Sequence, residues 1–589
     1  MARWRRRRWY WLLGAAGGAG GIGMARMMTR LRREKDEVIA RDGMVVAKHP
    51  LAAQAGVDVL ERGGNAVDAA VTTAFAAGVT LPFSNGIGGG GYLLFHDAAA
   101  GNTHVVDYAL QAPAAAHERM YELDPDGRVG GSFGWRLVRD NANWHGWQSM
   151  AVPGTVAGLA LALERFGTIA LADALAPAIR LAEEGFPLSQ GLAASINNQW
   201  ELISRHPSTF GVLTNSGRPF AVGERLRQPQ LARTLRRLAE AGAADFYRGR
   251  IADEIVADMR EHGGLLREAD LAEYRPRTPE RPLVGSYRGV TVHAAPGATG
   301  STTTLEILNI LSGYDLRGLG AGSAEALHLW IEASRLAFAD RFQYLADPAF
   351  VDAPWNGLLA PGYAAERRRE IDRSRARSRY TAGDPWPYEG RPRPAVTYPP
   401  SRPWEGGGTT HLSVVDRARN TVALTQTLLG WSGVALPRTG VIMNDGMGWF
   451  DPEPGHANSV APRKRGLNNM SPVILLAGGR PLLTLGAPGG RRIIGTVAQV
   501  ISNLLDHGLG VQAAIAAPKI DCSEPATKLD ARIPGEVVAA LETRGHRLAV
   551  VEGTPGASPS AVFIDHQTGL LHGGEDPFSE GVAVGYTAD

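Results

Sequence analysis

The chain contains a single cysteine, Cys522, among its 589 residues. One cysteine excludes an intrachain disulfide and every metal or redox motif that needs paired cysteines. The residue is best explained as a small buried apolar side chain, and a thiol nucleophile is the formal alternative. The compartment in which the protein works therefore cannot be deduced from its cysteine content.

The sequence also lacks an excess of charge of either sign. Its 61 basic and 59 acidic residues leave a formal net charge of +2, so no overall field attracts the protein to nucleic acid. HExxH and GxxxxGK[ST] motifs are absent, and with them the signatures of a zinc peptidase and a P-loop. With 44% hydrophobic and 20% charged residues, the composition is that of a globular enzyme.

Residues 1–36 form a segment of their own. Five arginines between Arg3 and Arg8 precede a weakly apolar stretch, residues 9–25, which ends at Arg26. This order is typical of an export signal, and the paired arginines suit a twin-arginine route. A retained membrane anchor that faces the protein outward is the second interpretation, and a solvated tail, compatible with a cytoplasmic protein, is the third. We expect a periplasmic, extracellular or membrane-anchored protein.

A glycine-rich motif, SNGIGGGGYLLFHD, occupies residues 84–97. A dinucleotide fingerprint follows a strand and opens a helix. Here the preceding segment has helical spacing and the following YLLFHD has strand character, which is the reverse order. The glycines are better explained by a turn that passes close to something bulky or reactive.

Residues 377–408 are rich in proline, glycine and tryptophan and predict a long irregular segment. The following segments THLSVVD, NTVALTQTL and GVIMND predict strands, and PLLTLGAPGGRRIIGTVAQVISNLL predicts a strand, a turn and a helix. The turn at Gly489 and Gly490 would present backbone N–H groups at a helix start, where an oxyanion can bind. Ordinary strand-to-helix packing is the alternative.

The segment EGGGTTHLSVVD, residues 405–416, places three glycines directly before two threonines at the start of a strand. One interpretation is a flexible hairpin loop. The other is a self-cleavage site, at which the hydroxyl of Thr409 attacks the carbonyl of Gly408. On these twelve residues alone the loop is favoured, because a short local pattern is weak evidence for catalysis.

Several separated motifs give the chain a specific resemblance from about Gly43 to the C-terminus. It resembles the γ-glutamyltranspeptidases, members of the N-terminal-nucleophile hydrolase superfamily. The resemblance rests on GGNAVDAAV (63–71), NGIGGGGYL (85–93), VPGTVAGL (152–159), LEILNIL (305–311), ADRFQYLADPAF (339–350), TTHLSVVD (409–416), MSP (470–472) and GAPGGRRII (486–494). It implies an α+β fold, a four-layer αββα sandwich, autoprocessed into a large subunit, residues 37–408, and a small catalytic subunit, residues 409–589.

The resemblance also implies the chemistry. Cleavage between Gly408 and Thr409 would free an α-amino group, whose pKa of about 8 suits a base for the threonine hydroxyl. Thr427 matches the family's second threonine, which hydrogen-bonds the nucleophile, and Gly489 and Gly490 match its oxyanion-hole glycines. Thr410 and His411 complete the TTH pattern, with structural roles at least as well supported as catalytic ones. No organic cofactor and no metal are implied.

Substrate recognition departs from the family pattern. Ala109 stands where the family has an arginine for the substrate α-carboxylate, and Leu429 replaces an asparagine. The family's glutamine and aspartate for the α-amino group align with Gly446 and Trp449, and its Ser-Ser pair aligns with Asn468 and Asn469. Without an arginine a bound carboxylate would lose its charge-assisted partner. One interpretation is that an apolar acyl pocket is lined by Leu429, Trp431 and Trp449. The alternative interpretation is that these side chains only pack in the hydrophobic core.

These features predict a self-processing enzyme that hydrolyses or transfers an acyl group of a small amide or peptide, γ-glutamyl by family default. An acylase-like enzyme for more apolar acyl groups, or for another bond type, is the first alternative. An unprocessed binding protein is the second. The expected partners are the chain's own two subunits, as a heterodimer, with no nucleic acid and with the N-terminus as the one membrane tether.

Overall fold

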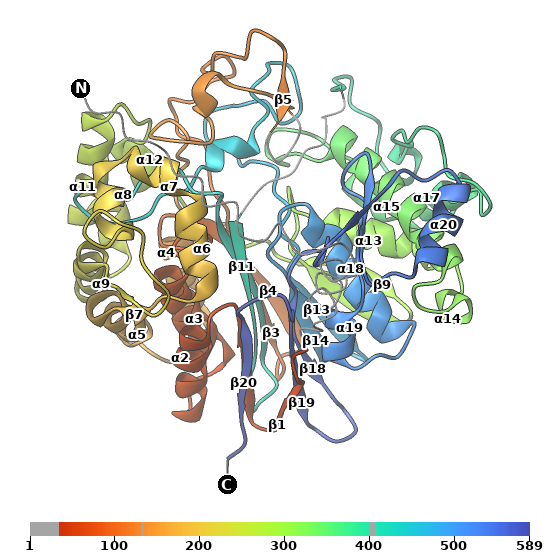
Figure 1. Cartoon of the computed structure of the whole chain (residues 1–589), viewed down its shortest axis with the longest axis horizontal. Helices are drawn as coiled ribbons and strands as arrows, with labels where there is room; N and C mark the ends of the chain where they lie inside the picture. Colours follow the sequence, from red (N-terminus) through yellow and green to blue (C-terminus); the bar gives the residue numbers. More distant parts are fainter. Residues whose placement is uncertain (1–33, 131–134, 400–407, 589) are drawn as a thin grey trace, which may run out of the picture.

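Two antiparallel β-sheets, packed face to face, form the centre of the protein (Figure 1). The structure is a computed structural model that describes residues 34–130, 135–399 and 408–588. The predicted export segment, up to residue 33, and residues 400–407, with the first two glycines of the run before Thr409, lie outside the described residues. No helix in the described ranges combines the length and the apolar character that a membrane crossing requires.

One sheet has six strands in the order β20-β2-β11-β12-β3-β4. Their bounds are β20 Val582–Tyr586, β2 Gly43–Ala47, β11 Gly408–Val415, β12 Thr421–Leu429, β3 Gly90–Asp97 and β4 Asn102–Tyr108. Strands from both sides of the predicted cleavage point are interleaved in this sheet, because β2 lies between β20 and β11, and β12 pairs with β3. Separation of the two predicted subunits would therefore require the sheet to be taken apart.

The other sheet has seven strands in the order β1-β19-β18-β14-β13-β10-β9. Their bounds are β1 Val38–Ala40, β19 Leu571–Glu575, β18 Ser560–Ile564, β14 Arg480–Gly486, β13 Val473–Ala477, β10 Val290–Ala294 and β9 Leu283–Tyr287. The inner faces of the two sheets meet around Met44, Val46, Val415 and Val562, which form a buried apolar layer.

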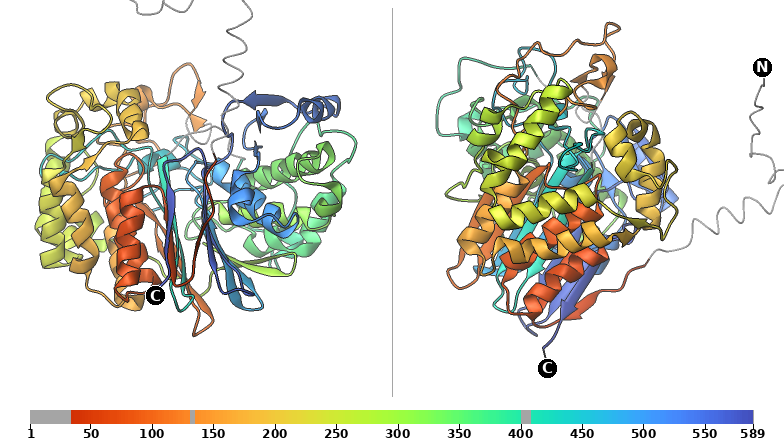
Figure 2. Two further views of the ribbon diagram at one scale, coloured as in Figure 1. Left: turned by 60° about the horizontal axis from the view of Figure 1, so that its bottom comes forward. Right: turned by 90° about the vertical axis from the view of Figure 1, so that its left-hand side faces the viewer.

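Helices cover both outer faces, so the layers run helix, sheet, sheet, helix (Figure 2). On the six-stranded sheet lie α2 Pro50–Glu61, α3 Ala66–Thr80 and α4 Thr155–Phe166, backed by α5 Leu171–Glu184 and α9 Pro229–Ala241. On the seven-stranded sheet lie α13 Ser301–Leu311, α18 Arg492–Leu505 and α19 Val511–Ala516, backed by α15 Ala324–Tyr344, α17 Pro361–Arg369 and α20 Gly535–Thr543. This is the predicted αββα sandwich.

Shorter elements fill the periphery. They are α6 Gln190–Asn198, α7 Trp200–Ser204, α8 Pro207–Leu213, α10 Ala244–Arg248, α11 Arg250–Glu261, α12 Glu268–Glu273, α14 Leu316–Leu319, α16 Trp355–Leu359, β5 Val129–Gly130, β6 Trp135–Arg136, β7 Phe186–Pro187, β8 Arg225–Leu226, β15 Ile520–Asp521, β16 Thr527–Asp530 and β17 Leu548–Val551, with 3-10 turns at η1 Arg139–Asn141, η2 Trp386–Tyr388 and η3 Gly446–Trp449.

Helix α3 shows how sequence places the layers. Asn65 caps it and forms a capping box with Asp68, which sets its first turn. Its side chains are mostly alanine, valine and threonine, and almost all are buried. A helix that is apolar on every side is buried on every side, and α3 accordingly lies between α2, α5 and the six-stranded sheet.

The predicted strands around residues 409–429 and 480–486 and the helix after Gly490 are confirmed. The prediction of a strand for GVIMND is wrong. Residues 440–445 form isolated bridges, Ile442 with Ala435 and Met443 with Gly88, and lead directly into η3. The segment alternates in hydropathy because it is buried against two different neighbours, without an extended strand beside it.

Candidate functional site

A mismatch in strand pairing surrounds Thr409. In the β11–β12 ladder, Gly408 pairs with Leu429 and Thr410 pairs with Gln426. One residue of β11 therefore lies opposite two residues of β12, Thr427 and Leu428. Such irregularities bend a strand and re-aim side chains, and they are frequent beside active sites. Here the mismatch turns the half-buried Thr409 side chain toward Thr427.

The Thr427 hydroxyl links three groups of the predicted cleavage site. Thr409 Oγ1 donates to Thr427 Oγ1 at 3.2 Å, and the Leu429 N–H donates to the same oxygen at 2.7 Å. Thr427 Oγ1 in turn donates to the carbonyl oxygen of Gly408. The predicted nucleophile and the carbonyl that it would attack thus share one hydrogen-bond chain.

The glycine motif at residues 84–91 lies directly against this centre. A Cβ on Gly89 would overlap the Thr427 carbonyl, a Cβ on Gly91 would overlap that of Thr425, and a Cβ on Gly88 would overlap that of Ile442. The prediction that these glycines allow a close approach is confirmed. They let β3 and its preceding turn pack against the backbone of Thr427 itself.

The turn at Gly489 and Gly490 lies at the same end of the sandwich. Across the two sheets Ser413 contacts Thr484, and the Gly486 Cα packs on the His411 ring. Residues 413 and 411 of β11 thus face residues 484 and 486 of β14. Two residues further in each direction, Thr409 and the turn after Gly486 lie at the same level. Both turn glycines have positive φ, 144° and 62°, which only glycine adopts readily there. Neither N–H donates a hydrogen bond within the described part of the chain.

His411 is fully buried between the sheets. Its Nδ1 lies 2.8 Å from Thr425 Oγ1 and its Nε2 lies 3.1 Å from Ser413 Oγ. Burial, with a smaller contribution from Lys48, lowers its pKa well below the usual range. The ring is therefore neutral and fully engaged, which favours the structural interpretation of this residue. Thr410 is likewise buried, beside it on β11.

Three of the predicted substrate residues lie in one apolar cluster. Ala109, Leu429 and Trp449 are each at most 4% exposed and belong to the same hydrophobic core, together with Met447 and Met470. Trp431 lies in the neighbouring core, where its ring meets Phe83 edge-on at 4.9 Å. The chain thus brings Ala109, Leu429 and Trp449 together, and it separates Trp431 from them.

The side chains of Asn468 and Asn469 are buried and hold other parts of the protein. Asn468 Nδ2 donates to the Tyr92 hydroxyl and to the Ala298 carbonyl, both at 2.9 Å. Asn469 Oδ1 accepts from Arg341 at 2.9 Å. Arg341 extends from α15 and also donates to the carbonyl oxygens of Thr299 and Asn468. These contacts join α15 to the segment that precedes β13.

Two charged groups of this region were not singled out by the sequence. Arg465 forms an ion pair with Asp107 at 2.5 Å, and the arginine is only 4% exposed. Asp445 is buried and accepts the N–H groups of Gly430 and Trp431 at 2.7 and 3.1 Å. Burial raises the pKa of Asp445 to about 7. Asp445 sits inside NDGMGWF, but no spacing rule reveals which backbone amides a carboxylate will hold.

Asp445 secures an unusual turn after β12. Leu429 and Trp431 both have positive φ, 72° and 93°, a conformation that costs non-glycine residues energy and persists only when the surroundings hold it. The two N–H groups on Asp445 provide that hold. The position of Leu429, whose own N–H orients Thr427, therefore depends on this buried carboxyl.

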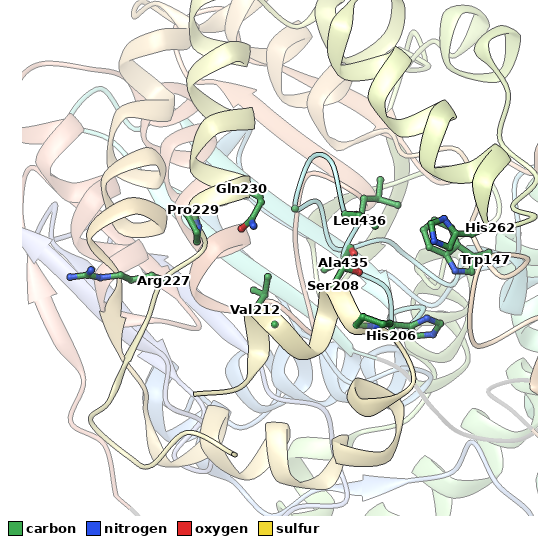
Figure 3. A pocket seen from close by; sticks show the side chains of 14 residues that line it. Trp147, His206, Ser208, Val212, Arg227, Pro229, Gln230, His262, Ala435 and Leu436 are labelled. Carbon is green, nitrogen blue, oxygen red and sulfur yellow. Dashed lines mark hydrogen bonds between the residues drawn. The ribbon is translucent and has the colours of Figure 1, made fainter. Parts of the chain in front are cut away.

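A cavity of about 600 Å³ lies elsewhere, between α8, the start of α9 and residues 435–440 (Figure 3). Trp147 stacks on His262 at its edge, with ring centroids 4.2 Å apart. None of the predicted catalytic residues lines it. It is therefore separate from the group around Thr409.

Comparisons with known proteins agree with the geometry. A family model described as Gamma-glutamyltranspeptidase matches residues 52–586. A glutathione hydrolase proenzyme from Bacillus subtilis (strain 168) is 36% identical over 552 residues, covering 93% of this chain and 92% of its own. An acylase ACY 1 proenzyme from Pseudomonas sp. (strain SE83) is 40% identical over 519 residues, with coverage of 87% and 88%.

Among solved structures, the chain is similar to a cephalosporin acylase from Bacillus halodurans. The TM-score is 0.82 and the sequence identity 31%, with coverage of 94% of this chain and 98% of that one. Similarity at this level extends through both sheets and both helical layers.

The pKa of Asp445 generates a prediction about stability. Because the folded-state pKa of about 7 exceeds the unfolded value of about 3.9, the folded state binds the extra proton. The free energy of unfolding that this group contributes is therefore full below about pH 4. It falls as the pH rises from about 4 to 7, by about 4 kcal/mol in total, and the contribution is lost above pH 7. Asp445→Asn removes this titration, so the thermal midpoint should depend less on pH between about 4 and 7.

The comparison is best made by calorimetry in a Thr409→Ala background, so that all proteins have one covalent form. Asp173→Asn, which changes an exposed acid in the first turn of α5, is the matched control and should retain the slope of the parent. An unchanged slope in Asp445→Asn would contradict the assignment.

Proposed function

The chain belongs to the γ-glutamyltranspeptidase family, and on that premise we propose that Thr409 is its nucleophile, freed by self-cleavage after Gly408. The family and the proenzyme relatives make the protein an amidohydrolase and acyltransferase that is produced as a self-processing precursor. The observation that carries the assignment of Thr409 is the hydrogen-bond chain from its hydroxyl through Thr427 to the Gly408 carbonyl.

The two hydrogen bonds from Thr409 to Thr427 and from Thr427 to the Gly408 carbonyl suggest how self-cleavage proceeds. Thr409 Oγ attacks the carbonyl carbon of Gly408, and negative charge develops on an oxygen that already accepts the Thr427 proton. The proton of Thr409 leaves toward Thr427. Collapse breaks the Gly408–Thr409 amide, and the threonine nitrogen takes up a proton. The resulting ester is hydrolysed by water, which yields a Gly408 carboxylate and a free Thr409 amine.

The same threonine then performs the acyl-transfer cycle. Its new α-amino group, with a reference pKa of about 8, accepts the hydroxyl proton directly or through water. Thr409 Oγ attacks the substrate carbonyl, the amine leaves, and water or a second amine takes the acyl group from the ester. The backbone N–H groups of Gly489 and Gly490 lie at a turn with positive φ and have no acceptor among the residues that the structure describes, so they suit the oxyanion.

For the acyl group, we favour an apolar chain over γ-glutamyl. The argument rests on Ala109, Leu429 and Trp449, which are buried in one apolar cluster where the family pattern has polar contacts for glutamate. Asp107, which accepts the Ala109 N–H, is itself paired with the buried Arg465. A free carboxylate bound there would have to compete for that arginine or remain unpaired, which is costly in a buried site.

Hydrolysis of γ-glutamyl amides is the second candidate. It is favoured by the glutathione hydrolase relative, whose similarity covers 93% of the chain, while the acylase relative supports the first candidate. Both use the same nucleophile, so they differ only in the acyl pocket.

We further propose the covalent organisation of the mature protein. The large subunit comprises residues 37–408 and the small subunit residues 409–589, held together by the shared six-stranded sheet. The basic and apolar segment at residues 1–36 would direct export or tether the protein to the outer face of a membrane.

Thr427→Val should slow self-cleavage by about 100- to 1000-fold, because it removes the donor to the Gly408 carbonyl but keeps the side-chain shape. Thr427→Ser retains the hydroxyl and should cleave at close to the parent rate. Intact-mass measurement at intervals after synthesis follows the reaction. Thr421→Val, on the same strand, removes a hydroxyl that donates to the Arg419 carbonyl and serves as the control. Equal rates for the valine and serine variants at Thr427 would refute this role.

Substrate preference can be measured with anilides. We expect aliphatic or aromatic acyl anilides to have at least about tenfold higher kcat/KM than γ-glutamyl anilide, since one buried unpaired charge costs more than the corresponding 1.4 kcal/mol. Trp449→Ala should lower kcat/KM for the aromatic acyl anilide and leave glutamyl turnover unchanged. Trp147→Ala, in the separate cavity, is the matched control. Efficient glutamyl turnover at low substrate concentration would instead establish the second candidate.

A further inference from the structure

We propose that His328, Glu332 and His546 bind one transition-metal ion, with Zn²⁺ as the leading candidate, and that the ion ties the large subunit to the small one. These side chains are almost completely buried, at 0%, 0% and 8% exposure. They lie apart from the Thr409 group. The sequence indicated no metal, because the three residues do not form a contiguous motif.

The fold brings the three residues together from distant parts of the chain. His328 and Glu332 are one turn apart on α15, which places them on the same helix face. His546 follows the end of α20, which packs beside α15 in Figure 1. One ligand atom from each residue can be chosen so that all three lie within 4.8 Å of one another.

Hydrogen bonds prepare His328 as a ligand. Its Nε2 lies 2.7 Å from the Asp372 carbonyl oxygen. Because a carbonyl can only accept, Nε2 carries the proton and Nδ1 presents a lone pair. That lone pair faces His546 Nε2, at 2.7 Å. A histidine that donates one ring N–H to a backbone carbonyl and directs the other nitrogen inward has the arrangement typical of metal ligands.

Glu332 supplies the anionic ligand. Its Oε1 accepts from the Tyr380 hydroxyl at 2.5 Å and from the Arg377 N–H at 3.4 Å. Its Oε2 is buried and has no hydrogen-bond partner in the described part of the chain. A buried carboxylate oxygen without a partner is costly. A metal ion between Oε2 and the two imidazoles would satisfy it.

Two imidazole nitrogens and one carboxylate oxygen are a zinc ligand set, with a fourth position for water. Metal–nitrogen bonds of about 2.0–2.1 Å in a tetrahedron require the nitrogens to be about 3.3 Å apart, so the histidines must separate by about half an ångström. His546 must also carry its proton on Nδ1. Arg335 and Arg544 lie near His546, and their positive charge repels any cation. Ca²⁺ and Mg²⁺ bind imidazole too weakly to overcome this repulsion, whereas transition-metal ions form strong bonds to imidazole.

The ion would join the two subunits. His328 and Glu332 belong to residues 37–408 and His546 to residues 409–589, so this step rests on the proposed cleavage, whereas metal binding does not. A disulfide cannot perform the task because Cys522 is the only cysteine. A bound ion would instead anchor α20 and its following turn to α15 after the chain is cut.

The test uses metal-free protein prepared with a chelator and then titrated with Zn²⁺ alone. We expect one equivalent to be retained after desalting in the parent and in uncut Thr409→Ala, and Co²⁺ to give the visible absorption of a four-coordinate site. We expect two variants to weaken Zn²⁺ binding by more than about 100-fold each: Glu332→Gln, and His546→Gln, which keeps an N–H donor for His328. Loss of a residue that only supports a ligand costs about 10- to 100-fold, so a larger loss identifies a direct ligand. Circular dichroism checks that each variant is folded.

His456→Ala is the control, because Asp451, Glu453 and His456 form the other cluster of this kind in the described ranges. The His456→Ala variant should still retain one equivalent of Zn²⁺ after desalting. A folded parent that binds no Zn²⁺, or loss of binding in His456→Ala but not in His546→Gln, would overturn the proposal. In the cut parent, the metal should raise the urea concentration at which the subunits separate. If Zn²⁺ is bound but the urea concentration does not increase, the metal site would stand and only its role in linking the subunits would be overturned.

Discussion

The proposed reaction depends on one irregularity in the pairing of β11 with β12. A regular ladder would place Thr409 opposite a single residue, as its neighbours are. The mismatch instead brings its hydroxyl to Thr427, whose own proton is directed at the Gly408 carbonyl. Around this point the other features act as supports. The glycines before β3 allow close packing, Asp445 holds the turn after β12, and the Leu429 N–H orients Thr427.

The shared sheet explains how a chain could be cut in its middle and remain one protein. Strands β2, β3 and β4 precede the predicted cleavage point, β11 begins at it, and β12 and β20 follow it, yet all six belong to one antiparallel sheet. The β2–β11 and β12–β3 ladders cross the subunit boundary. Cleavage would release only the local backbone at Gly408. The uncut chain already has both sheets in place, so maturation requires no refolding.

Much of this arrangement could be predicted from the sequence, because it is encoded locally. The capping box at Asn65, the alternation of β12 and the glycine turn before α18 each depend on residues close in the chain. The failed strand prediction at residues 440–445 has a different cause. Its alternation reflects contacts with Gly88 and Ala435 from two directions, and hydropathy cannot distinguish such burial from a sheet.

The groups that the sequence did not reveal are defined by partners that no motif places. Arg465 pairs with the distant Asp107, and His546 meets His328 from 218 residues away. Asp445 holds two backbone amides only 15 and 14 residues before it, in the turn after β12. None has a characteristic spacing. Even the predicted substrate residues divide once they are placed, since Asn468 and Asn469 hold the protein together while Ala109, Leu429 and Trp449 share an apolar cluster.

Intact-mass analysis of the purified protein beside its Thr409→Ala variant tests the central claim most directly. The account predicts two fragments in the parent, divided between Gly408 and Thr409, and a single uncut chain in the variant. An uncut parent would leave Thr409 without its amine base and would contradict the proposed mechanism. Cleavage at the same bond in Thr409→Ala would show that another group performs it.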